Sequence, residues 1–244
     1  MVKIPKRKID DGLPQGVNRQ YSPVFHFKEM PIHLLFSILR YEAILNAARA
    51  CLKFNKIPNQ NLKILDIGCG HGEMFLYLKK VFKLRNTKIK YVGVEIDPWK
   101  IDFLKTNFKD VNLITRDIRF YKLKSNYDLI ICSEVLEHIE KQYLQNLVNQ
   151  MAEKSKYTIL SVPQPTYKRN NPWHINEMLT DDLMKVVKLA GFKVLFKGWF
   201  YTKFSSKEEG EFMPSIIAKF YHGLKKTYPK EGNVTFLVLK GKYE

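Results

Sequence analysis

The sequence lacks any long apolar run: no stretch approaches the 18 consecutive apolar residues that indicate a membrane-spanning helix. Its basic first residues contain no apolar core of the kind that a secretion signal needs, so we expect no secretion. Cysteine is scarce. The three cysteines, Cys51, Cys69 and Cys132, are widely spaced and form no metal-binding pair. We therefore expect reduced thiols in a cytoplasmic protein.

Acidic residues are few relative to basic ones. The chain has 24 Asp and Glu against 41 Lys and Arg, which gives a formal net charge of +17. Such an excess is compatible with a polyanionic partner such as RNA. It is spread along the chain and consists mostly of lysine, so a general compositional bias explains it equally well.

The length of 244 residues allows one α/β domain with a modest addition. Residues 1–30 are rich in Pro, Gly, Asn and Lys without periodicity, and we expect an N-terminal arm or cap there. The domain itself is expected over 31–244, with an insertion at about 201–232 before the last strand. Its first element is predicted to be an amphipathic helix that begins near Pro31, where apolar residues recur at intervals of three and four.

Strands and helices then alternate along the chain. Strands are predicted at 63–68, 90–96, 111–117, 127–133 and 157–163, with helices near 73–84, 99–107, 137–153 and 180–190. Two further strands are predicted at 192–200 and 233–241. Apolar strands separated by helices indicate a doubly wound, mostly parallel sheet that is covered on both faces.

The stretch "LDIGCGHGEM" follows the first predicted strand and opens a helix, as in nucleotide-binding folds. A dinucleotide fingerprint needs glycines at 68, 70 and 73, whereas this loop has Gly68, Gly70 and Gly72, with Glu73 at the last position. Glu73 and the nearby Asp66 would repel a pyrophosphate at the helix N-terminus. The loop therefore favours a cationic ligand without phosphate, such as S-adenosylmethionine.

The acidic residues at the ends of the next strands fit the same ligand. Asp66 can attract the ammonium group of its methionine part, and the glycines let the backbone approach it closely. Glu95 can accept hydrogen bonds from both ribose hydroxyls. Asp117 can accept the adenine amino group while Ile118 packs on the ring. Ligands bind at this edge of a doubly wound sheet.

These residues resemble the class I, Rossmann-like S-adenosylmethionine-dependent methyltransferases. The likeness covers about residues 35–200 and rests on "LDIGCGHG", "VEID", "RDI" and "DLIICSEVLEHI". The resemblance implies a seven-stranded sheet whose last strand is antiparallel. It also implies that Ser133 lies beside the methionine part of the cofactor and that Arg40 is a candidate for contacting its carboxylate.

"SEVLEHI" places Glu134, Glu137 and His138 together, and on one face if the segment opens a helix. His174 follows the fifth strand at the same edge of the sheet. In one interpretation, His138 or His174 orients an oxygen or nitrogen acceptor on a small or medium-sized metabolite and takes its proton, and no metal is needed.

Two alternatives remain open. Glu134, Glu137, His138 and His174 could bind a divalent metal that holds two ribose hydroxyls, which resembles the small-RNA 3′-terminal 2′-O-methyltransferases. The chain could also be a non-catalytic scaffold that keeps the cofactor fold, although degenerate copies usually lose residues such as Asp66 and Glu95.

Overall fold

The computed structural model describes most of the predicted domain. The described residues are 30–52, 61–83, 88–109, 111–165, 174–200 and 234–243. The predicted arm, except Met30, and the predicted insertion lie outside them. In the described part, no helix is both long enough and apolar enough to cross a membrane.

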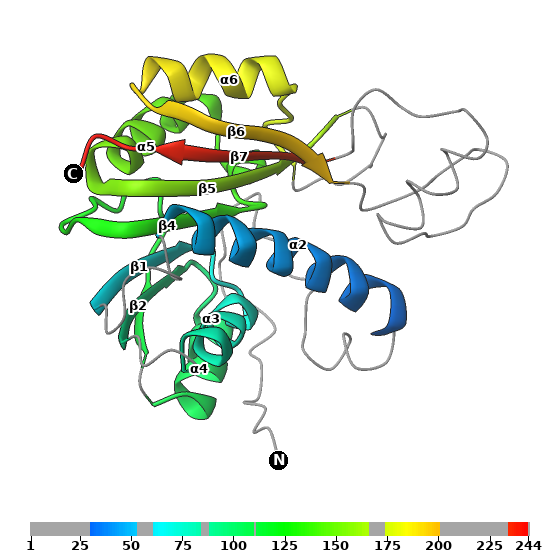
Figure 1. The fold of residues 1–244 in the computed structure, drawn as a ribbon, viewed down its shortest axis with the longest axis vertical. Coiled ribbons are helices and arrows are strands. Elements are labelled where there is room, and N and C mark those ends of the chain that lie inside the picture. The colour runs from blue at the N-terminus through cyan, green and yellow to red at the C-terminus, as the bar shows by residue number, and fades with distance from the viewer. Residues whose placement is uncertain are drawn as a thin grey trace, which may run out of the picture.

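A seven-stranded sheet forms the centre of the molecule (Figure 1). In chain order the strands are β1 (Asn61–Ile67), β2 (Lys88–Glu95), β3 (Asn112–Thr115), β4 (Tyr127–Ser133), β5 (Ser155–Pro163), β6 (Lys193–Phe200) and β7 (Val234–Lys240). Their spatial order is β3-β2-β1-β4-β5-β7-β6. The first five pair in parallel, and β7 is antiparallel to both β5 and β6. The predicted doubly wound sheet with an antiparallel last strand is confirmed.

Helices cover both faces of the sheet. They are α2 (Met30–Cys51), α3 (Glu73–Lys83), α4 (Pro98–Asn107), α5 (Lys141–Lys154) and α6 (Thr180–Leu189), with a short 3-10 helix, η1 (Leu136–His138), before α5. Helices α2, α3 and α4 pack on one core cluster, and α5 and α6 pack on the other. This separation is what right-handed crossovers between parallel strands produce.

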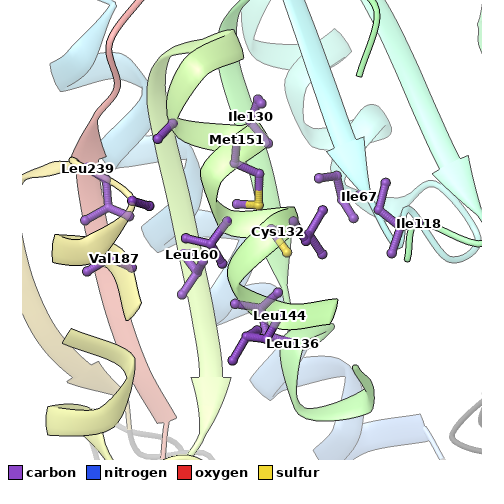
Figure 2. Packing of buried hydrophobic residues seen from close by; sticks show 14 of the residues in the cluster. Ile67, Ile118, Ile130, Cys132, Leu136, Leu144, Met151, Leu160, Val187 and Leu239 are labelled. Atoms are coloured by element: carbon purple, nitrogen blue, oxygen red, sulfur yellow. The ribbon is translucent and has the colours of Figure 1, made fainter. Parts of the chain in front are cut away.

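Strand β4 shows why the central strands are apolar along their whole length. Leu129 and Ile131 belong to the cluster under α2 and α3, whereas Ile130 and Cys132 belong to the opposite cluster. Figure 2 shows Ile130 and Cys132 among the side chains of α5 and β5. Because side chains alternate along a strand, both sets must be apolar when both faces are buried.

The parallel strands end at one edge of the sheet, which we call the carboxyl edge. Strands β1, β2 and β4 lie side by side at its centre. The spatial order reverses between β1 and β4, since β2 and β3 lie to one side and β5 to the other. Ligands of doubly wound folds bind at such a reversal.

Candidate active site

The glycine loop joins β1 to α3 at the carboxyl edge. Gly68, Gly70 and Gly72 have φ of 70°, 56° and 80°, in the left-handed region that only glycine enters readily. An added Cβ would come within 2.4 Å of Val135 at position 68 and within 2.4 Å of Leu104 at position 72. At position 70 it would meet only a carboxylate oxygen at 3.7 Å. Two glycines therefore let the loop pack against its neighbours, and Gly70 leaves its backbone open to a ligand.

Glu95 holds the glycine loop against the end of β2. Its carboxylate accepts hydrogen bonds from the backbone N–H groups of Gly70 at 3.0 Å, Ile96 at 2.9 Å and Asp97 at 3.1 Å. The ammonium group of Lys100 lies 3.9 Å from the same carboxylate. Glu95 is buried and held in a fixed orientation, and its two oxygens retain acceptor capacity for ligand hydroxyls.

Asp66 lies near the end of β1, under the glycine loop. Its Oδ2 accepts a hydrogen bond of 2.5 Å from the hydroxyl of Tyr91 on β2. Burial raises the pKa of Asp66 to about 7, against the lowering effect of this hydrogen bond. The charged carboxylate is thus poorly solvated, and a nearby ligand cation would stabilise it. Nothing in the sequence around Asp66 points to Tyr91, because their contact depends on how β1 and β2 pair.

Asp117 and Ile118 lie in the loop after β3. The guanidinium of Arg119 donates to both oxygens of Asp117, with distances of 2.6 to 3.0 Å, and to Glu140. The pKa of Arg119 is raised, chiefly by the hydrogen bond to Asp117. The predicted adenine contact would therefore share Asp117 with Arg119. Ile118 is buried and lies at the margin of the core cluster near Ile67 (Figure 2).

Ser133, the last residue of β4, belongs to a short chain of hydrogen bonds. Its hydroxyl lies 2.8 Å from that of Ser161 on β5, which donates to Glu134 at 3.0 Å. Since Ser161 has one hydroxyl proton, Ser133 is the donor in the first bond. Glu134 has a φ of 58°, so the chain turns sharply directly after β4. The side chain of Glu134 therefore lies against β5, where it accepts the hydrogen bond from Ser161.

The segment after Glu134 departs from the predicted helix. Helix α5 begins at Lys141, and the 3-10 helix η1 contains both Glu137 and His138. The prediction that 137–153 is one helix is therefore wrong at its start, because the left-handed turn at Glu134 and the 3-10 geometry redirect the chain. Glu134 and Glu137 accordingly do not share a helical face.

Glu137, His138 and His174 converge at the carboxyl edge. The carboxylate of Glu137 is 3.7 Å from Nε2 of His138, and the two imidazole rings have centroids 5.1 Å apart at 79°. One ligand atom from each of the three residues lies within 4.8 Å of the others. Glu137 is only 1% exposed, so it is not a solvated surface residue. Glu134, the fourth predicted member, is not in this group.

Asn176 is a residue that sequence reasoning missed. Its backbone N–H donates to the carbonyl of Glu137 at 3.0 Å, which ties the loop carrying His174 to η1. Its side chain is 2% exposed, and neither polar atom of the amide has a hydrogen-bond partner among the described residues. Buried amides are nearly always paired, so this one is a candidate for contacting a bound molecule.

Arg40 lies on α2, close to the acidic residues of this edge. Its Nη2 donates to the hydroxyl of Tyr41 at 3.4 Å, and its buried Nε has no hydrogen-bond partner in the part of the chain that the structure describes. Burial lowers its pKa, but Tyr41 and Glu134 raise it by more. A buried guanidinium that keeps its charge and has a spare donor fits the expected contact with a ligand carboxylate.

Comparison with known proteins identifies the family. The family model described as a methyltransferase domain matches residues 37–198. The chain belongs to the class I S-adenosylmethionine-dependent methyltransferases.

Solved methyltransferase structures share the fold. An S-adenosylmethionine-dependent methyltransferase from Archaeoglobus fulgidus superimposes with a TM-score of 0.58 at 20% identity, over 91% of this chain and 100% of that chain. The N-methyltransferase NodS from Bradyrhizobium japonicum, solved with S-adenosyl-L-homocysteine, gives 0.57 at 12% identity, over 85% and 88% of the two chains.

Relatives with known activities include both O- and N-methyltransferases. The ubiquinone biosynthesis O-methyltransferase of Rickettsia conorii is 28% identical over 220 residues, which cover 75% of each chain. The (S)-tetrahydroprotoberberine N-methyltransferase of Eschscholzia californica is 28% identical over 115 residues, which cover 44% of this chain and 31% of the relative. The methyltransferase thus spans about a third of the second relative.

The residues of the carboxyl edge fit the cofactor of the family, S-adenosylmethionine. The open backbone at Gly70 admits a close approach, and Glu95 is oriented beside it. Asp66 and Arg40 offer opposite charges, as a zwitterionic amino-acid group requires. The cofactor supplies a methyl group on a sulfonium, which is already activated for transfer.

Proposed function

We propose that this methyltransferase transfers a methyl group to an oxygen or nitrogen of a small or medium-sized metabolite. The pairing of His138 with His174 beside the strand that ends in Ser133 carries this proposal. An imidazole there can orient an acceptor hydroxyl or amine and take its proton as the new bond forms. The relatives, which are named for O- and N-methylation, support the same class of acceptor.

The chain contributes mainly position and exclusion of water. In-line attack on an activated methyl needs the acceptor atom to be held close and correctly aligned. Glu95, Asp66 and the glycine loop fix one reactant, and η1 with the loop after β5 borders the other. The proton leaves the acceptor for His138, whose ring is 23% exposed and can pass it on to solvent.

The test is a labelled-methyl transfer screen of the purified chain against two pools. One pool contains small metabolites with phenolic, alcoholic or amino groups, and the other contains RNA with free 3′ ends. We expect label in the metabolite pool only. Label confined to the RNA would refute the proposal.

A second candidate function has one observation in its favour, the convergence of Glu137, His138 and His174. Two imidazoles and a carboxylate suffice to hold a divalent metal with open positions for acceptor oxygens. Ligand atoms on one ion lie at most about 4.4 Å apart. The observed 4.8 Å would therefore need a small side-chain shift. This candidate is metal-dependent 2′-O-methylation at an RNA 3′ end, without Glu134 as a ligand.

Chelation separates the two candidates. Under the metabolite proposal, transfer continues at an unchanged rate after treatment with EDTA and removal of the chelator. Under the metal-dependent candidate, EDTA abolishes transfer, and Mn²⁺ restores it in the wild type but not in the Glu137→Gln variant. That pair of results would favour the metal-dependent candidate.

A further inference from the structure

The edge of the sheet opposite the site is where the parallel strands begin and β7 ends (Figure 1). Several lysines lie at this edge. The strand register places Lys63 of β1 directly opposite Lys90 of β2. At the other end of the sheet it places Lys193 of β6 directly opposite Lys240 of β7. Lys156 lies between these pairs, on β5, next to the residue that pairs with Lys240. These five lysines are called the lysine edge.

The lysine edge has little electrostatic compensation among the described residues: Nζ of Lys63 lies 5.0 Å from the centroid of the Tyr127 ring, a cation–π contact. Like charges directly opposite each other on neighbouring strands destabilise a sheet. None of the five lysines forms an ion pair with another described residue. Asp128, the acidic residue at this level of the sheet, accepts a hydrogen bond from the backbone N–H of Lys63 at 2.8 Å. One carboxylate cannot balance five ammonium groups, so an external polyanion would relieve the repulsion.

Lys242, which is nearby, has a structural role and is not counted. Its side chain lies over Gly191, where an added Cβ would meet Cε of Lys242 at 2.5 Å. Gly191 follows the C-terminal end of α6, where a cation interacts favourably with the helix dipole.

The residues near Lys193 in the chain indicate which polyanion fits. Leu189 at the end of α6 is 78% exposed, and Leu195 and Phe196 on β6 are 46% and 54% exposed. Of the tyrosines next to these lysines, Tyr91 and Tyr127 are buried, and Tyr157, which pairs with Lys240, is half-buried. They therefore offer little ring surface on which a base could stack. Ammonium groups next to exposed leucines suit a layer of anionic headgroups over acyl chains better than RNA.

We propose that the lysine edge docks the methyltransferase on an anionic lipid surface, with Leu189 and Leu195 reaching the headgroup boundary. A strand of seven residues spans roughly 23 Å, so the lipid would lie about that far from the methyl-transfer site. The acceptor then enters from the aqueous side. This docking is independent of which acceptor the site takes.

The experiment uses the full chain and sedimentation with vesicles. One set contains phosphatidylcholine alone, and the other contains phosphatidylcholine with phosphatidylglycerol. We expect binding to the anionic vesicles only, which salt weakens. Each lysine near such a surface contributes about fivefold to partitioning, so the variant Lys193→Gln/Lys240→Gln should bind about 25-fold more weakly.

The matched control is Lys141→Gln/Lys185→Gln, which removes the same charge from exposed lysines outside the lysine edge. It should lose much less binding than the Lys193→Gln/Lys240→Gln variant. Equal losses in the two variants, or equal binding to neutral vesicles, would overturn the proposal. Tight binding of a single-stranded RNA oligomer through Lys193 and Lys240, at a salt concentration where the protein does not bind the anionic vesicles, would also overturn it. Cofactor-dependent melting of each variant verifies that it is folded.

Discussion

At the scale of single residues, Glu95 connects the fold to the ligand. Three backbone N–H groups fix its carboxylate, and one of them belongs to Gly70 in the glycine loop. Hydrogen bonds to a charged acceptor contribute about 1.5–3 kcal/mol each. Glu95→Gln should therefore raise the Kd for S-adenosylmethionine about tenfold to a hundredfold, as measured by calorimetry. The exposed Glu153→Gln is the matched control, and an unchanged Kd for Glu95→Gln would remove Glu95 from the cofactor site.

Asp66 should make the stability of the cofactor-free protein depend on pH. Its pKa is raised from 3.8 to about 7 in the folded state, so the folded chain binds a proton that the unfolded chain has released. The free energy of unfolding should thus fall as pH rises through this window, by up to about 1.4 kcal/mol per pH unit. Asp66→Asn should flatten this part of the melting profile. A wild-type profile that rises with pH there would contradict the raised pKa.

His138 is expected to act in transfer and not in cofactor binding. His138→Gln should lower kcat by about a hundredfold to ten-thousandfold, the usual contribution of a positioned base. Its Kd for S-adenosylmethionine should remain that of the wild type, because the proposed role concerns the acceptor proton. Rapid transfer measurements at saturating cofactor test this, and a variant with full kcat would assign the proton to another group.

At the scale of elements, the turn from β1 into α3 must pack against its neighbours and must also leave its backbone open to the cofactor. Substitutions can separate these two requirements. Gly72→Ala would force a methyl group to within 2.4 Å of Leu104 at a φ of 80°, so it should cost about 1–3 kcal/mol of folding stability. Gly70→Ala has open space around the new carbon and should cost less stability than Gly72→Ala. Gly70→Ala should nevertheless weaken cofactor binding more than Gly72→Ala does. Thermal melting with and without S-adenosylmethionine measures both the loss of folding stability and the loss of cofactor binding. The same ratio of these two losses in Gly70→Ala and Gly72→Ala would contradict this division.

Elements were predicted well where periodicity alone determines them. The alternation of apolar strands and helices predicted the central, mostly parallel sheet, and the family resemblance implied its antiparallel last strand. The prediction failed at residues 137–140, because the positive φ of Glu134 and the 3-10 helix are decided by contacts with β5, which local sequence does not reveal. The ion pair between Asp117 and Arg119 was not predicted either, although the two residues are only two positions apart.

At the scale of the whole molecule, charge is divided between the two edges of the sheet. The carboxyl edge gathers buried acidic groups that suit a cationic ligand. None of the five lysines of the lysine edge forms an ion pair with another described residue. The sequence showed only the total of +17. It could not reveal this division, because the register of the strands decides which lysines are neighbours.

For the molecule as a whole, the central claim is that its site binds a sulfonium nucleoside and rejects an anionic dinucleotide. Thermal melting with each ligand tests this most directly. At a hundredfold excess over Kd, S-adenosylmethionine should add about 2.7 kcal/mol to the free energy of unfolding, which corresponds to a melting shift of roughly 5–10 °C. NAD at the same concentration should leave the melting temperature unchanged. A shift with NAD and none with S-adenosylmethionine would contradict the account.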